Sequence, residues 1–137
     1  MESDCVKQII LKAASIIRTG GLLRGRRHDF ARYSLEDIRG PHCLLGAIDA
    51  AVCHIRLQEP CQSIKPGIAT QSAVDEVAAV LPNKLPHHPR DTYNDLGYRT
   101  DEAYNTNSPS KCAWYSNVMA KTAEDVAVML EKAAAQL

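Results

Sequence analysis

The chain has 137 residues, of which 45% are hydrophobic and 23% charged, and its 16 basic and 16 acidic side chains give a formal net charge of zero. This composition is typical of a folded globular chain, and a neutral total disfavours a general nucleic-acid binder. No apolar run reaches the roughly 18 residues that a membrane-spanning helix needs, and the length predicts a single helical domain over residues 1–137.

The first predicted helix runs from about Ser3 to Thr19. Its apolar residues recur with helical spacing, and Gly20-Gly21 ends it. The second predicted helix runs from about Pro41, with the proline at its first position, to Leu57. Small residues in its interior allow another helix to approach closely, so we expect this helix at the centre of the fold. They are Gly46, Ala47, Ala50 and Ala51.

The third predicted helix starts at Thr70 or Gln71 and continues to Leu81, where Pro82 stops it. Residues 83–111 are polar, and we expect a long loop with one short helix that starts near Thr100. The final helix occupies residues 122–137, because Thr122 and Asp125 form a near capping box ahead of an apolar stripe. The sequence therefore predicts an all-α fold, a compact bundle of four to five helices with a long polar loop before the last helix.

Three segments carry a family resemblance. Residues 9–21 form an opening helix with a closing glycine, residues 42–51 contain the pattern C-x-x-G-A-x-x-A-A, and residues 113–133 place a tryptophan turn before a threonine-capped helix. Together they resemble a family of small uncharacterised proteins of actinobacteria, other bacteria and their phages. This chain departs from the family in having Tyr115 and Ser116 after Trp114 and Leu22 after the first glycines. The resemblance implies the fold and no particular activity.

Five cysteines are present, without a CxxC pair: Cys5, Cys43, Cys53, Cys61 and Cys112. The N-terminus lacks the basic region of a secretion signal, so we expect a cytoplasmic protein with reduced thiols. His42-Cys43 and Cys53-His54 are the most suggestive pairs, since a thiolate with an imidazole is a nucleophile or a zinc ligand set.

On one helix these two pairs lie roughly 16 Å apart. A shared site would need Cys61, Cys112, His87 or His88 from elsewhere. The alternative is that the cysteines are small apolar fillers, and we expect no metal, no cofactor and no catalytic residue. Two carboxylate pairs, Asp75-Glu76 and Glu124-Asp125, are expected in first helical turns, where they favour the helix dipole.

Two polar segments are candidates for binding. A basic patch of Arg24, Arg26, Arg27 and Arg32 suits phosphate or an acidic surface, although it also suits a solvated loop with nearby acidic residues as partners. The second segment combines tyrosines with polar and charged residues, as protein interfaces do, although a solvated loop packed by its tyrosines is the alternative. Its candidate residues are Tyr93, Asn94, Asp95, Tyr98, Arg99 and Tyr104.

No nucleotide-binding, zinc-protease or nucleophile-elbow motif is present. The sequence therefore favours a non-enzymatic module that binds another protein, with a phage or mobile-element protein that modulates a host defence complex as the specific expectation. Self-association stays open. The alternatives are a small enzyme or metal-binding protein built on the Cys and His residues, and nucleic-acid binding through the basic patch.

Overall fold

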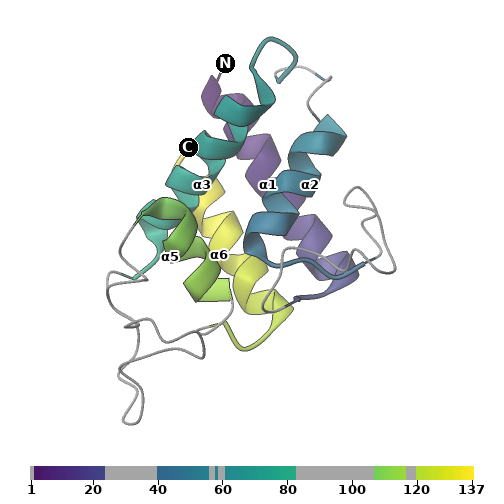
Figure 1. Ribbon diagram of the computed structural model, residues 1–137, viewed down its shortest axis with the longest axis vertical. Helices are drawn as coiled ribbons and strands as arrows, with labels where there is room; N and C mark the ends of the chain where they lie inside the picture. Colours follow the sequence, from purple (N-terminus) through teal and green to yellow (C-terminus); the bar gives the residue numbers. More distant parts are fainter. Residues whose placement is uncertain (1, 24–39, 56–57, 59–60, 83–106, 117–119) are drawn as a thin grey trace.

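The computed structural model describes residues 2–23, 40–55, 58, 61–82, 107–116 and 120–137 (Figure 1). Its helices are α1 (Glu2–Gly20), α2 (Leu44–Ile55), α3 (Pro66–Val80), α5 (Ser108–Trp114) and α6 (Ala123–Ala135). Over these residues the only β pairing is an isolated bridge between Leu22 and His42. The predicted all-α fold is confirmed.

Helices α1 and α6 form the most extensive contact of the fold, and α1 also packs against α2 and α3. The apolar stripes predicted for both helices are buried. Ile9, Ile10, Ile16 and Ile17 are at most 1% exposed, and Val126 and Leu130 are fully buried. Each such side chain contributes roughly 1.5–3 kcal/mol relative to full exposure.

The start of α6 has the predicted capping box. The Thr122 hydroxyl accepts a hydrogen bond from the Asp125 amide at 3.2 Å, and the Asp125 carboxylate accepts from the amides of Lys121 and Thr122 at 3.0 and 3.1 Å. These bonds satisfy amides that have no acceptor within the helix.

An exposed ion cluster connects α1 to α6. The Arg18 guanidinium donates to both carboxylate oxygens of Glu124 and of Glu131, at 2.8–2.9 Å. Arg18 lies near the end of α1, so the cluster ties that end of the helix to α6.

Helix α2 starts at Leu44 instead of the predicted Pro41. The residues before it are used in the isolated bridge, where the Leu23 amide donates to the His42 carbonyl and the His42 amide donates to the Gly21 carbonyl. Gly21 has a φ of +92°, a conformation that glycine adopts without strain, and it ends α1 as predicted. The small residues of α2 are buried, and the helix packs against α1, α3 and α5.

Helix α3 begins at Pro66, several residues before the predicted start, and ends at Val80 ahead of Pro82. Proline at the first helical position explains the earlier start, because its missing amide costs nothing there. Asp75 and Glu76 consequently lie in the second half of α3, and their predicted place in a first turn was wrong. Glu124 and Asp125 do lie in the first turn of α6.

Helix α5 occupies residues that were predicted as loop. The Asn107 side chain caps it by accepting from the Ser110 amide at 2.9 Å, and Pro109 lies in its first turn. Trp114, at its end, is half-buried against the core. The predicted short helix near Thr100 lies outside the described residues.

The expectation of reduced thiols was wrong for two cysteines. Cys5 in α1 and Cys61, in the turn before α3, form a disulfide with Cα atoms 4.8 Å apart. Cys43, Cys53 and Cys112 are not disulfide-bonded. Among the described helices, none combines the length and the apolar character needed to cross a bilayer.

Candidate functional site

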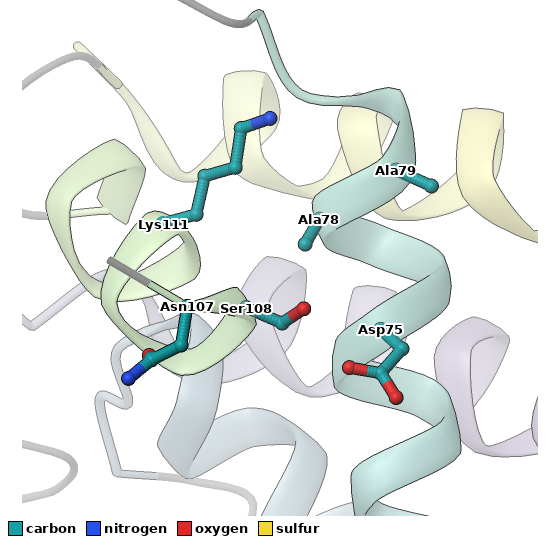
Figure 2. Close-up of a pocket in the computed structure, with 6 residues that line it drawn as sticks. All are labelled: Asp75, Ala78, Ala79, Asn107, Ser108 and Lys111. Atoms are coloured by element: carbon teal, nitrogen blue, oxygen red, sulfur yellow. The ribbon is translucent and has the colours of Figure 1, made fainter. Parts of the chain in front are cut away.

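The candidate site is an open groove of about 380 Å³ between α3 and α5 (Figure 2). We call it the α3/α5 groove. Its lining residues are Asp75, Ala78, Ala79, Asn107, Ser108 and Lys111. The first three come from α3 and the last three from the start of α5, so residues far apart in the sequence form the two walls.

The walls follow from the helical periodicity of α3. Asp75 and Ala79 are four residues apart and lie on the exposed face of the helix, whereas Ala78 turns toward the core and is 5% exposed. Because the side chains of Ala78 and Ala79 are small, they do not fill the space between α3 and α5, and the groove stays open.

Helix α5 is held against α3 by a buried cysteine. The Cys112 thiol is fully buried and donates to the Val74 carbonyl at 3.7 Å. Burial is the main cause that raises the pKa of this thiol to about 12, so the group stays protonated at neutral pH. Cys112 therefore positions α5 and is a poor nucleophile.

The polar groups of the groove differ in what they offer a ligand. Figure 2 shows the Asp75 carboxylate and the Ser108 hydroxyl facing the space from opposite walls, with the Lys111 side chain extending away from both of them. The Asn107 side chain turns away, because its oxygen caps α5. Asp75 also accepts a hydrogen bond from the Gln71 amide group at 2.9 Å. The groove thus has a carboxylate and a hydroxyl that face each other beside two alanines, with Lys111 at its edge.

A second hollow, of about 390 Å³, lies on the other side of Asp75. It is lined by Ser3, Val6, Ser72, Asp75, Glu76 and Leu137. Ser3 and Leu137, near the two ends of the chain, therefore line the same hollow beside α3, and Figure 1 shows both ends on that side of the molecule. Asp75 lines both hollows and is exposed, whereas Glu76 and Lys111, the other charged residues that line them, are half-buried.

The candidates from the sequence have different outcomes. Both binding segments, the basic patch of Arg24, Arg26, Arg27 and Arg32 and the residues Tyr93, Asn94, Asp95, Tyr98, Arg99 and Tyr104, lie outside the described residues, and so do His87 and His88.

The Cys and His pairs lie at opposite ends of α2. His42 and Cys43 are buried directly before its start, and Cys53 and His54 are in its last turn. The Cys43 sulfur accepts from the Gly46 amide at 3.4 Å, and the Ser116 hydroxyl accepts from the Leu44 amide at 3.1 Å. Cys43 and Ser116 thus cap α2. Within the part of the chain that the structure describes, no three His, Cys, Asp or Glu side chains are grouped to hold a metal ion.

The sequence contained one usable signal for the groove. Asn107 followed by Pro109 is a typical helix start, and it would have placed Ser108 and Lys111 on a helix. No local pattern indicates that this helix packs beside Asp75, since that depends on tertiary structure.

Comparisons with known proteins identify the family of this chain and give no further relative. Neither the comparison with curated proteins nor that with solved structures found a match. A family model described as a family of unknown function, DUF6197, matches residues 1–136, which confirms the predicted membership of an uncharacterised family. The chain is a member of DUF6197.

Proposed function

We propose that the protein is a non-enzymatic module that binds another protein through the α3/α5 groove and the tyrosine-bearing segment. That segment, with Tyr93, Asn94, Asp95, Tyr98, Arg99 and Tyr104, belongs to the stretch that connects the end of α3 to Asn107. It is therefore tethered to both walls of the groove. This connection is the observation that carries the proposal.

The form of the groove supports a macromolecular partner. Its volume lies near the lower limit of small-molecule pockets, which bury most of their ligand among apolar side chains. Here Asp75, Ala79 and Asn107 are exposed, and the polar groups face an open space. An open polar rim is typical of protein interfaces, where a few aromatic and arginine anchors contribute most of the affinity. The segment between α3 and Asn107 contains such residues in its sequence.

We infer further that the protein originates from a phage or mobile element, acts in the cytoplasm and modulates a host complex such as a defence complex. The support is the resemblance of residues 9–21, 42–51 and 113–133 to proteins of bacteria and their phages. Self-association through the same face is an alternative that the experiment below distinguishes.

The proposal is tested by affinity capture from the native host with a matched pair of variants. Ala79→Arg fills the groove, whereas Ala135→Arg places the same side chain at another exposed helical alanine, in α6. We expect one protein to be retained by the unmodified chain and by Ala135→Arg, and its retention to fall at least about tenfold with Ala79→Arg, as for loss of an interface anchor. Tyr93→Ala and Tyr98→Ala should lower it as well.

Equal retention by every variant, or no retained protein at all, contradicts the proposal. Retention of DNA or RNA that disappears at high salt would replace it with nucleic-acid binding through Arg24 to Arg32. Capture of the chain by itself would indicate self-association instead.

A further inference from the structure

The two ends of α1 are anchored by different kinds of interaction. Near its C-terminal end, Arg18 is paired with two glutamates of α6, and Leu22 forms a bridge with His42. Near its N-terminal end, the covalent anchor is the bond from Cys5 to Cys61. Opening that bond would release one end of the helix while the other stays fixed.

The bond joins α1 to the turn that leads into α3. In this turn the Cys61 amide donates to the Gln58 carbonyl at 2.8 Å, and the Ile64 amide donates to the Cys61 carbonyl at 3.0 Å. Val6, the neighbour of Cys5, lines the second hollow together with Ser72 and Glu76 of α3. The bond therefore fixes the position of the first turns of α1 beside α3.

Most of α1 does not depend on this bond. Ile9, Ile10, Ile16 and Ile17 are fully or almost fully buried in the core. The first turn of a helix is weakly held, because its amides have no acceptor within the helix. Two cysteine thiols are also small and apolar enough to stay in a core. Reduction would thus loosen the start of α1 without unfolding the bundle.

We propose that Cys5 and Cys61 form a redox-controlled latch that fastens the first turns of α1. A dithiol reductant opens it: the dithiol loses two electrons and two protons and becomes a cyclic disulfide, while the sulfur–sulfur bond breaks and Cys5 and Cys61 each gain one electron and one proton as thiols. Cytosolic disulfides are usually transient or redox-sensing, and the proposed cytoplasmic location supplies the dithiol. The latch thus rests on the proposed cytoplasmic location, and it does not depend on the proposed binding of another protein.

The burial of the sulfur atoms links reduction to motion. Cys5 is fully buried and Cys61 is 3% exposed, so a dithiol cannot attack the bond in the closed structure. Attack requires local opening of the first turns of α1 or of the turn at Cys61. The latch therefore responds slowly to a reductant.

The test is amide hydrogen exchange of the purified chain before and after dithiothreitol. The amides of residues 6–9 bond to carbonyls in the first turns of α1, and we expect their exchange to accelerate at least about tenfold after reduction. The amides of residues 14–20 should accelerate only as far as the loss of global stability on reduction allows, and by less than those of residues 6–9, and the helical circular dichroism should be retained. Cys5→Ala with Cys61→Ala should reproduce the reduced pattern, and Cys53→Ala should leave the oxidised pattern unchanged.

Three outcomes overturn the latch. Loss of the helical signal on reduction would make the bond a permanent requirement of the fold. An acceleration at residues 6–9 no larger than that at residues 14–20 would mean that the bond does not fasten the first turns of α1 in particular. Alkylation of all five cysteines in the denatured, unreduced chain would show that the bond does not form, since the structure predicts that only Cys43, Cys53 and Cys112 react.

Discussion

Among single residues, Thr122 has the most sharply defined role. Its hydroxyl accepts from the Asp125 amide, and the Asp125 carboxylate accepts from the Thr122 amide. We expect Thr122→Ala to lower the free energy of unfolding by about 1 kcal/mol, because one amide of α6 loses its acceptor. Chemical denaturation measures this loss.

The control for this prediction is Thr70→Ala. The Thr70 hydroxyl lies inside α3 and donates to the Pro66 carbonyl at 2.9 Å, so it caps nothing. We expect a change within about 0.5 kcal/mol there. If both variants lost the same free energy of unfolding, the capping hydroxyl of Thr122 would contribute no more than the hydroxyl of Thr70 inside a helix.

This cap also shows which residue-level features a sequence can reveal. Thr122 and Asp125 are three residues apart, so their interaction depends on local geometry, and it was predicted. The disulfide joins residues that are 56 positions apart. An odd number of cysteines without a paired spacing leaves every pairing open, and tertiary packing alone brings Cys5 to Cys61.

At the scale of helices, the contact of α1 with α6 should depend on pH. Hydrogen bonds from Arg18 are the main cause that lowers the pKa of Glu124 and of Glu131 below the ordinary 4.5. Carboxylates with a lowered pKa stabilise the fold above the unfolded value, and this contribution disappears as the pH falls through the folded values. We therefore expect stability to fall below about pH 4.5, and to fall less in Arg18→Gln.

Urea midpoints across this acidic range measure the effect. Lys7→Gln is the matched control, because Lys7 is an exposed cation of α1 outside the ion cluster. It should keep the pH dependence of the unmodified chain. Because all three groups of the cluster are partly exposed, added salt should weaken the difference between Arg18→Gln and the unmodified chain. An Arg18→Gln variant with an unaltered acid profile would contradict this account.

The helix boundaries show how far local patterns reach. Glycines at 20 and 21 and the cap at Thr122 defined α1 and α6 within one or two residues, because both signals act within one turn. The start of α2 was misplaced because the bridge at His42 uses the backbone before the helix. Helix α5 was missed because seven residues leave too little periodicity to recognise. The α3/α5 groove was missed with it.

At the scale of the whole molecule, the disulfide closes a loop that includes α1, α2 and the connections between them. A bond across 56 positions restricts the unfolded chain, and the loop-entropy relation gives about 4 kcal/mol for this separation. We expect Cys5→Ala with Cys61→Ala to lower the free energy of unfolding by up to this amount. Urea denaturation of oxidised protein measures it, with Cys53→Ala as the control for the loss of a thiol.

The predicted loss would be large for the fold without abolishing it. Domains of this size are stable by about 5–15 kcal/mol, and the core between α1, α2 and α6 keeps its buried isoleucines in the variant. The alanine pair should therefore unfold cooperatively at a lower urea concentration. The denaturant slope should rise slightly, because the unfolded chain without the bond exposes more surface. If the variant had the same urea midpoint and denaturant slope as the unmodified protein, the bond would restrict neither the folded nor the unfolded chain.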